Sequence, residues 1–562
     1  MTFDLVSSSW LGTLPRSGEP AELALQDALL NAHLITGLAL PSPAMMPAVL
    51  RQILLPVVVH ALGTPRSLGA WKDWFEQDGF SLEQREKLVV YLDEHRDRFD
   101  LLSDQAPFGQ VAGLETPKGE TKSVALLIPA MASGNNVPVF SCLTEGETLE
   151  LRPAEAALWL LHAQCWDTAA IKSGAVGDDK MKSGKTTGNP TGPLGQLGVV
   201  VPLGRSLYET IVLNLPIDYD GQAALGVPQW AGERVTASWE ARPARDLLDL
   251  WTWQSRRIRL IATDTPDGLR VTRAVLAAGD RLTQTPSIEP HTAWRHVAKP
   301  KAGQAPRYPR RHRPGRSAWQ GLNALLTLAL PEDADGVSTS LLLRQIGELY
   351  AARCLPADYP LRVATYGVEY GNQSAVVEHV MVDEVPLPAA ALAADHQDLS
   401  QLLLEAVTQA DRAAFALDRM LADLRRAAGG EPLPRDKGHR PGEVLLHALD
   451  PWMRRLLTGM SRQPDDIDVL EAGMSAWEEV VWRETRRIAG ELLAAAPLTA
   501  FAGRTKKAEK GEKKDVFRSA TADRALTGAL YKILPRAAEA EQERQAERNQ
   551  TSSTSLEEEA PV

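Results

Sequence analysis

Apolar side chains recur at helical spacing through the last third of the chain, from Asp398 onward. Spacings of three and four residues place such side chains on one face of a helix, as in the group Leu417, Met420, Leu421 and Leu424. Three further segments repeat the pattern, at 444–457, 465–495 and 516–548, and prolines at 451 and 535 are expected to interrupt or kink two of them. Four amphipathic helices in series predict a four-helix bundle.

The chain before Pro388 mixes the periods of helices and strands. Helical patterns cover 43–62, 81–98 and 154–165, and short apolar runs typical of buried strands cover 199–201, 210–215, 257–262 and 269–271. These patterns predict an α+β fold: a large mixed α/β N-terminal domain with long loops at 1–390, followed by the four-helix bundle at 391–548. The polar, acidic end at 549–562 is expected to be a disordered tail.

Composition narrows the class of protein. The chain has 562 residues, 44% of them hydrophobic, which suits a globular protein with more than one domain. Its three cysteines form no CxxC pair and its histidines form no HExxH motif, so we expect no disulfide framework, no metal and no cofactor. No apolar run reaches the length of a membrane span, and the first residues do not read as a secretory signal, so a cytoplasmic location with no membrane partner is expected.

Positive charge is concentrated in one segment of a chain whose net charge is -11. Two aromatic residues, Trp294 and Tyr308, lie among these charges and could stack on bases or pack against arginine. The segment suggests a polyanion site, although a solvated loop rich in proline and arginine would look the same. We call residues 294–316 the basic segment; it has no carboxylate, and its Lys and Arg residues are Arg295, Lys299, Lys301, Arg307, Arg310, Arg311, Arg313 and Arg316.

Residues 172–204 form a glycine-rich segment with little helical pattern. Glycine lets backbone approach a ligand closely, and lysine neutralises phosphate. Ser183–Thr186 looks like the end of a phosphate-binding loop, but Asp179 stands where that motif requires its first glycine, so the spacing excludes it. A plain flexible loop remains the alternative to a ligand-binding one, whose candidate residues are Gly174, Gly177, Lys180 and Lys182.

Several segments, in their order along the chain, resemble CasA, the large-subunit family of the type I-E CRISPR surveillance complex Cascade. They are Phe3–Leu5 with Trp10–Leu11, Phe99–Gln110 with its central Pro107–Phe108, the stretch 126–142, and Gly371–Ser374 after a strand-like run at 362–366. Members of that family also end in a four-helix bundle. The resemblance therefore spans nearly the whole chain.

The resemblance implies a non-enzymatic subunit that recognises the protospacer-adjacent motif of duplex DNA from the minor groove. It also implies partners: guide RNA, the other Cascade subunits, double-stranded target DNA with its displaced strand, and a helicase–nuclease recruited to the assembled surface. One copy per complex is expected. The minor groove offers few distinguishing groups, so such a protein relies on backbone approach, a probing cation and shape.

The resemblance also assigns roles to residues of this chain. Lys299 matches the family's lysine finger, and Asn372, Gln373 and Ser374 match the wedge that splits the first base pairs. The glycine loop maps to Gly174–Gly184, with Gly177 as the candidate. The family's mobile loop, which contacts the end of the guide RNA or the motif, maps to Asn135, Asn136 and Phe140.

The sequence departs from the family in one respect, and two other functions remain as alternatives. Some relatives carry a cysteine cluster in the N-terminal domain, whereas residues 218–232 contain no cysteine, so no structural zinc is expected. A basic segment would equally suit an RNA-binding or translation-associated scaffold. The second alternative is an enzyme with an unrecognised active site.

Overall fold

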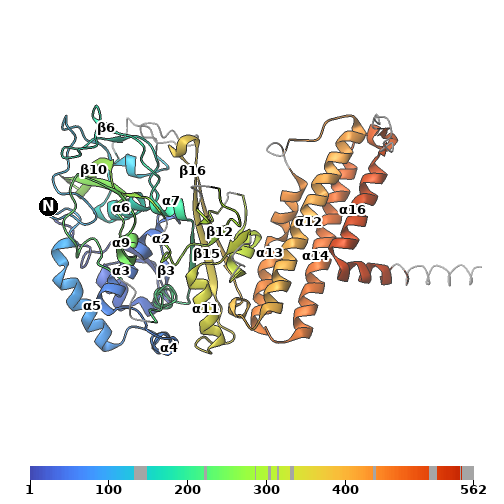
Figure 1. Cartoon of the computed structure of the whole chain (residues 1–562), viewed down its shortest axis with the longest axis horizontal. Helices are drawn as coiled ribbons and strands as arrows, with labels where there is room; N and C mark the ends of the chain where they lie inside the picture. The colour runs from blue at the N-terminus through green and yellow to red at the C-terminus, as the bar shows by residue number, and fades with distance from the viewer. Residues whose placement is uncertain are drawn as a thin grey trace, which may run out of the picture. The chain divides into compact units, whose positions relative to one another are not determined.

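The computed structural model describes residues 1–131, 149–219, 225–284, 286–301, 305–312, 315–328, 335–434, 438, 440–505, 516–544 and 546 (Figure 1). The chain divides into two compact units. Unit 1 comprises Met1–Val385 and Leu392–Asp395, and unit 2 comprises Pro386–Ala391 and His396–Val562. Unit 1 mixes helices and strands, whereas unit 2 is almost entirely helical, which confirms the α+β fold class.

The first part of unit 1 packs helices against a small three-stranded sheet of order β2-β1-β3. An apolar helical run at 45–62 forms its core, and the residues just before Pro56 widen into a π-helix because proline offers no N–H and its ring crowds the preceding turn. The elements are β1 Leu11–Pro15, β2 Ala21–Leu23, α1 Leu25–Leu30, β3 Ile35–Leu38, α2 Met45–Val49, η2 Leu50–Leu54, α3 Leu55–Leu62, α4 Leu68–Glu76 and α5 Leu82–Glu94.

The run Met45–Leu62 is also the one helical stretch in the described residues that is long and apolar enough to cross a membrane. However, 78% of it is buried inside the protein. Its buried members include Arg51, whose guanidinium donates to both carboxylate oxygens of Glu289 at 2.6 and 2.7 Å. This burial and pairing are typical of the core helix of a globular unit.

The centre of unit 1 is a long hairpin laid against a buried helix. Strands β9 and β10 pair along their whole length, with the expected turn at Pro266–Gly268 between them, and β10 also pairs with β4 and β5. Every residue of α6 but two is buried. The elements are β4 Lys122–Ser123, α6 Pro153–Trp166, β5 Lys172–Ser173, β6 Lys185–Thr186, α9 Leu247–Trp251, β9 Arg256–Thr265 and β10 Gly268–Ala278.

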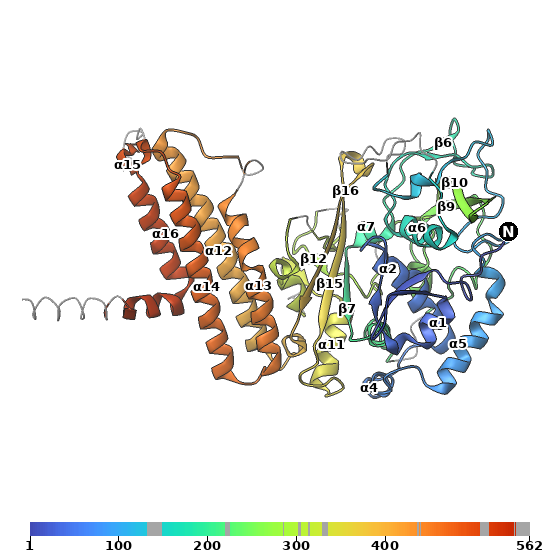
Figure 2. The ribbon, with the colours of Figure 1, turned by 180° about the vertical axis from the view of Figure 1, so that it is seen from behind.

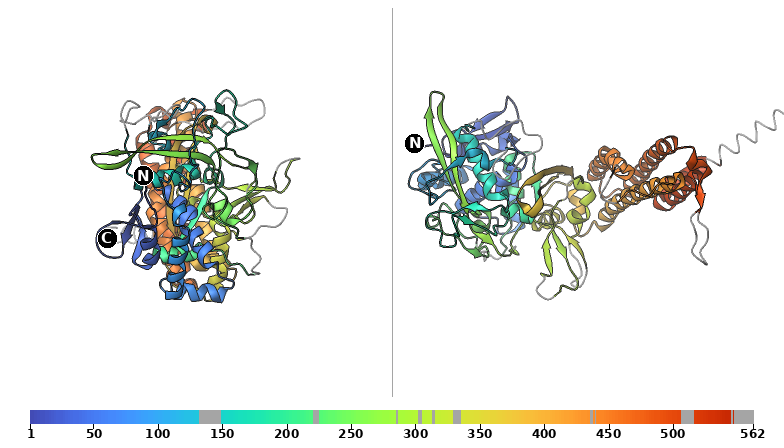
Figure 3. Two further views of the ribbon diagram at one scale, coloured as in Figure 1. Left: turned by 90° about the vertical axis from the view of Figure 1, so that its left-hand side faces the viewer. Right: turned by 90° about the horizontal axis from the view of Figure 1, so that it is seen from above.

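A second sheet, of order β16-β15-β7, lies beside this centre, and Figures 1 and 2 show its three strands side by side from both faces. A third sheet, of order β13-β12-β14, extends away from the rest of unit 1 (Figure 3). The elements are α7 Pro193–Leu197, β7 Val199–Leu203, α8 Leu207–Leu213, β8 Ala241–Arg242, β11 Arg281–Leu282, β12 Trp294–His296, β13 Arg307–Pro309, α10 Asn323–Leu326, β14 Gly336–Ser338, α11 Leu341–Ala351, β15 Arg362–Tyr370 and β16 Val377–Pro386; short 3-10 turns cover Ala32–Leu34, Arg96–Arg98, Val124–Leu127, Ala318–Gly321, Asn372–Ser374 and Ala389–Leu392.

The predicted strand at 210–215 is wrong, because residues 210–213 belong to helix α8 and residues 214–215 form the turn after it. Ser206 caps the helix, its hydroxyl accepting from the backbone N–H of Glu209 at 3.1 Å. Every residue of α8 is buried, so the apolar run carries no alternation that would separate a helix from a strand. The N-cap serine was the signal in the sequence that favoured a helix.

Unit 2 is built from four long helices, as the periodicity predicted, and Pro451 does not interrupt its helix. The helix α16 ends before Pro535, and helical structure resumes at 535. Glu478 of α14 is fully buried and accepts from the backbone N–H groups of Arg536 and Ala537 at 2.7 and 3.1 Å, which satisfies the new helix start. The elements are α12 Gln397–Ala428, α13 Pro441–Arg462, α14 Ile467–Ala494, α15 Thr499–Ala502, β17 Arg504–Thr505, β18 Val516–Phe517 and α16 Ser519–Ile533.

A buried ionic cluster, which we call the Arg256 anchor, fixes the backbone just before the glycine-rich segment and again at Pro190 within it. The Arg256 guanidinium, on β9, donates to the carboxylate of Asp167, and to the backbone carbonyls of Thr168 and Pro190 at 2.8 and 2.7 Å. Lys172 completes the anchor, with its Nζ 2.6 Å from Asp167 Oδ2. One guanidinium therefore closes a loop of some twenty residues whose own composition would leave it flexible.

Charge balance in the Arg256 anchor depends on one carboxylate. Burial would raise the pKa of Asp167, but the two cations hold it below its ordinary value. Burial lowers the pKa of Lys172 to about 8, because Asp167 offsets the loss of solvent only in part and the Arg256 charge opposes a second cation. Asp167 therefore stays ionised at neutral pH and compensates both cations.

We predict that unit 2 folds autonomously. A fragment of residues 386–562 should give a helical circular dichroism spectrum and a single cooperative urea transition, because its four helices bury apolar faces against one another. A shorter fragment ending at residue 500 lacks α16 and should lose that cooperativity. A gradual, non-cooperative transition of the longer fragment would contradict the division into units.

Asp167→Asn should destabilise the protein by about 3–5 kcal/mol, since it leaves two buried cations without their counter-charge. The measurement is the free energy of unfolding of the full chain in urea. Asp264→Asn, the same chemical change at an exposed position of β9, is the matched control and should have little effect. Equal unfolding free energies for the two variants would show that the Arg256 anchor does not hold the fold.

Candidate nucleic-acid interface

The turn between β15 and β16 presents two polar side chains on a tightly built backbone. The backbone N–H of Gly371 donates to the carbonyl of Val376 at 2.9 Å, and that of Ser374 donates to the carbonyl of Gly371 at 2.8 Å. Gln373 and Ser374 have φ values of 55° and 53°, in the left-handed region. Asn372 and Gln373 are exposed. We call residues 371–376 the wedge turn.

Two hydrogen bonds tie the wedge turn to the Arg256 anchor. The backbone N–H of Ala169 donates to the carbonyl of Ser374 at 2.8 Å. The hydroxyl of Tyr370, the last residue of β15, donates to the carbonyl of Trp166 at 2.7 Å. Both partners flank Asp167 and Thr168, so the turn is fastened to the same backbone that Arg256 holds. The structure therefore brings the predicted wedge residues beside the start of the glycine-rich segment.

Close packing of α7 against β15 reinforces this junction. A side chain at Gly195 would place its Cβ 2.2 Å from the Tyr370 hydroxyl oxygen, so only glycine fits there. Gly195 is one residue before Gln196, whose carbonyl accepts from Arg311 Nε at 3.3 Å. Arg311 of the basic segment is thus bonded to α7, the same helix that packs against β15 beside the wedge turn.

The predicted glycine loop is ordered by its own contacts. Gly174 is buried, its N–H donates to the carbonyl of Gly184 at 2.9 Å, and a Cβ there would fall 2.1 Å from the sulfur of Met181. Gly177 is exposed and has a φ of +90°. Of the two glycines, Gly177 is therefore the one at which backbone can meet a ligand.

The two candidate lysines of this segment differ in their surroundings. Lys180 pairs with Asp179 at 3.0 Å, and its ammonium also lies 5.1 Å from the ring centre of Trp239. Lys182 is exposed, and its ammonium makes no ion pair within the described residues. A phosphate would have to compete with Asp179 for Lys180, whereas Lys182 is available at once.

Two short strands form within the basic segment. Trp294–His296 and Arg307–Pro309 pair as antiparallel strands β12 and β13, and β14 completes the sheet. Arg307 stacks on Trp294 with its Cζ 4.3 Å from the ring centre, and Arg295 lies 5.9 Å from the ring centre of Tyr308. These pairs lie on opposite faces, because successive side chains alternate along a strand. Each arginine is oriented by its ring but keeps its N–H groups for a ligand.

Lys299 follows β12, and its side chain is exposed. The N–H of the preceding Ala298 donates to Asp335 Oδ1 at 2.9 Å, which fixes the backbone next to the lysine. Lys301 is exposed as well. The structure does not bring Lys299 into contact with the wedge turn within the described residues, so the two would have to meet on a ligand.

Arg310 and Arg311 of the basic segment also have structural contacts. Arg310 donates to the carbonyl of Gly321 at 3.1 Å, and its own backbone N–H donates to the carbonyl of Ala293 at 2.8 Å. Arg311 is exposed apart from its bond to Gln196. Arg313, like Asn135, Asn136 and Phe140 of the predicted mobile loop, lies outside the described residues.

Sequence reasoning missed the residues that hold this site together. Arg256, Asp167 and Tyr370 are separated by up to two hundred residues in the chain and carry no motif. An aspartate after a long apolar helix and an arginine at the head of an apolar strand were visible, but nothing in the sequence paired them. Within the described residues, no group of three or more His, Cys, Asp or Glu is placed to hold a metal ion.

The chain is similar to known proteins over most of its length. The family model described as CRISPR-associated protein Cse1 matches residues 4–488. A CRISPR-associated protein CasA/Cse1 of Thermus thermophilus is 27% identical over 519 residues, which cover 87% of this chain and 93% of that protein.

Two solved structures show the same fold. The crystal structure of Thermobifida fusca Cse1 has a TM-score of 0.80 at 30% identity, covering 95% of this chain and 99% of the other. A chain of a structure titled CRISPR RNA-guided surveillance complex has a TM-score of 0.62 at 19% identity, covering 95% of this chain and 99% of that one. The family match extends over most of the sequence, so the resemblance noted from short segments is confirmed: the chain belongs to the CRISPR-associated Cse1 (CasA) family.

Proposed function

We propose that this chain is the non-catalytic large subunit of an RNA-guided DNA surveillance complex, where it reads the protospacer-adjacent motif from the minor groove and starts strand separation. The observation that carries the proposal is the wedge turn: exposed Asn372 and Gln373 on a backbone fastened to a buried anchor. Separating stacked bases costs a few kcal/mol per base step, so the side chains that separate them must be held firmly by the rest of the protein.

The roles divide among three surfaces of unit 1. The wedge turn enters beside the first base pair, Gly177 and Lys182 approach the backbone of the motif, and Lys299 probes the minor groove. Arg295 and Arg307, already oriented by Tyr308 and Trp294, hold the flanking phosphates. The minor groove shows little more than the difference between A·T and G·C pairs, so motif reading relies on shape and on these close approaches.

The partners follow from this role. The subunit would dock at the end of the guide RNA through the loop that carries Asn135, Asn136 and Phe140, one copy in each complex. Unit 2 would face neighbouring subunits and help to retain the displaced strand, and the assembled surface would recruit a helicase–nuclease. Guide–target pairing and backbone contacts offset the cost of opening, as in other RNA-guided systems.

Replacing Gln373 and Ser374 together by glycine should slow opening of the base pairs beside the motif while leaving docking intact. Both residues have positive φ, which glycine adopts without strain, so the change removes the side chains and keeps the turn. The measurement is the association of the assembled complex with duplex DNA, compared with DNA mismatched at the first base pairs. The variant should recover most of its binding on the mismatched DNA; an equal defect on both would assign the residues to docking or folding.

Lys299→Ala should weaken binding of motif-bearing DNA by the assembled complex and spare its assembly on guide RNA. One lost phosphate or groove contact should lower the salt slope of log K by about 0.9. Lys118→Ala, the same change at another exposed lysine of unit 1, is the control. Unchanged affinity and slope relative to that control would remove Lys299 from the interface.

A further inference from the structure

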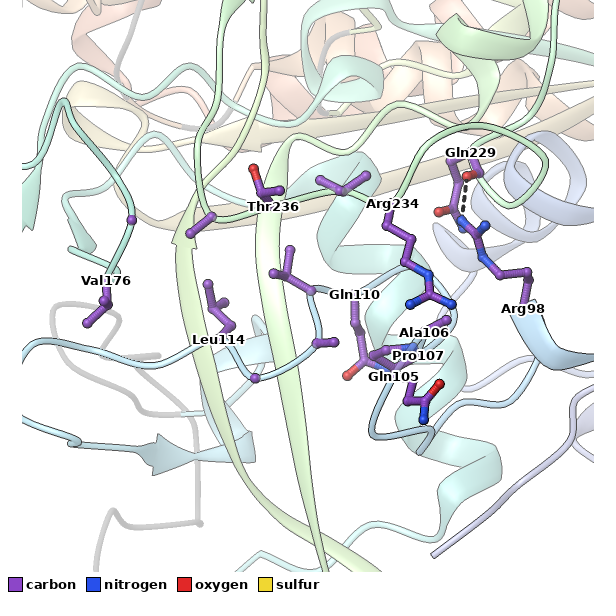
Figure 4. Close-up of a pocket in the computed structure, with 16 residues that line it drawn as sticks. Arg98, Gln105, Ala106, Pro107, Gln110, Leu114, Val176, Gln229, Arg234 and Thr236 are labelled. Carbon is purple, nitrogen blue, oxygen red and sulfur yellow. Dashed lines mark hydrogen bonds between the residues drawn. The ribbon is translucent and has the colours of Figure 1, made fainter.

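A pocket separate from the wedge turn opens in unit 1 between three segments far apart in sequence (Figure 4). Its walls come from the loop 105–114, from Val176 with Gly177, and from the stretch 229–237. Its volume is about 350 Å³. This lies at the small end of the range of about 300–1,000 Å³ found for small-molecule sites.

One side of the pocket carries two arginines. Arg98 is held in place by bonds from its guanidinium to the carbonyls of Gly232 and Gln229, at 3.3 and 3.2 Å. Arg234 makes no ion pair or hydrogen bond through its guanidinium within the described residues, and Figure 4 shows it extending over the pocket toward Ala106 and Gln110. Burial lowers the pKa of Arg98 and the nearby Arg234 charge adds to this, while the neighbouring Asp97, which does not line the pocket, opposes them only in part. An anion between the two would relieve the repulsion.

No carboxylate is among the described residues that line the pocket. This absence of negative charge is local, because the chain as a whole carries a net charge of -11. The pocket therefore favours an anionic group over a cation or a neutral solute.

The opposite side is apolar. Val111 and Leu114 belong to a buried cluster with Ala175, Val275 and Ala277, against which Val235 and Ala237 also pack. A bare inorganic anion would leave this wall in contact with water. The wall instead fits the flat, weakly polar face of an organic ring.

A polar group suited to a ring edge lies between these two sides. The side-chain amide of Gln105 is exposed and has no partner within the described residues, so it offers a donor and an acceptor together. The amide of Gln110, by contrast, is fully used: it donates to the carbonyl of Leu101 at 2.7 Å and accepts from the N–H of Leu260 at 2.7 Å. Gln105 is thus free to pair with a ligand, while Gln110 fixes the pocket floor.

From two cations, an apolar wall and a free amide in one cavity, we infer that this pocket binds a single nucleotide. Arg98 and Arg234 take its phosphate, the apolar wall takes the face of its base, and Gln105 pairs with the base edge. The nucleotide is either a free nucleoside monophosphate or an unstacked residue of a nucleic-acid strand; the chemistry is the same. This inference does not depend on the proposed function, since its test uses the isolated chain, although Gly177 belongs both to the pocket wall and to the proposed motif contacts.

The test is calorimetric titration of the full chain with adenosine 5′-monophosphate. Arg234→Gln should weaken binding about tenfold or more, because a charge-assisted hydrogen bond to phosphate is lost. Arg66→Gln, the same change at an exposed arginine outside the pocket, should leave the affinity unchanged. Ala112→Trp keeps both arginines but fills the exposed mouth of the cavity, so it should also abolish binding.

Three results would overturn the inference. They are equal affinities for Arg234→Gln and Arg66→Gln, unimpaired binding by Ala112→Trp, or inorganic phosphate binding as tightly as the nucleotide. A second titration with a 5′-phosphorylated adenine trinucleotide identifies the source. Tighter binding than the mononucleotide, lost in the same two variants, assigns the pocket to a strand end, whereas equal binding assigns it to a free nucleotide.

Discussion

The site depends on one buried guanidinium. Arg256 bonds to Asp167 and to the carbonyls of Thr168 and Pro190, so it joins the end of α6 to the middle of the glycine-rich segment and fixes both to β9. The wedge turn is then fastened to this same backbone through Ala169 and Tyr370. A buried pair of charges is costly to desolvate, but removing one partner leaves an uncompensated buried charge and costs more.

This constraint explains how a glycine-rich sequence can form a fixed structure. Glycine-rich segments lose much conformational entropy on ordering, and a turn with two left-handed residues is strained on its own. The contacts of the Arg256 anchor and the close packing of Gly195 against Tyr370 offset this loss of entropy and this strain. The proposed wedge turn is consequently held in one position on unit 1. Lys299 and Lys182, by contrast, keep exposed side chains that can adapt to a bound duplex.

The sequence predicted the helical unit well because its information is local. Each helix carries an apolar stripe at a period of 3.6 residues, and tertiary packing agrees with it. The hairpin of β9 and β10 was equally readable from two apolar runs around Pro266–Gly268. The stretch 210–215 was not, because full burial removes the alternation that separates strand from helix.

The candidate site was predictable only in part. The basic segment, the glycines and the turn could be named from composition and from a family resemblance, and their roles in DNA recognition remain predictions. The Arg256 anchor could not be named, because it pairs residues ninety positions apart whose types are common. The paired strands within the basic segment were also missed, since proline and arginine dominate its composition and hide the short β12 and β13.

The central claim is that the anchored wedge turn itself parts the base pairs beside the motif. The most direct measurement places 2-aminopurine in the first base pair next to the motif and follows its fluorescence as the assembled complex binds. The guide RNA used should have no complementarity to the DNA, so that guide pairing cannot open the duplex. The account predicts a rise in fluorescence on motif-bearing DNA alone. No rise until a complementary guide is supplied would contradict it, because opening would then come from base pairing and not from the protein.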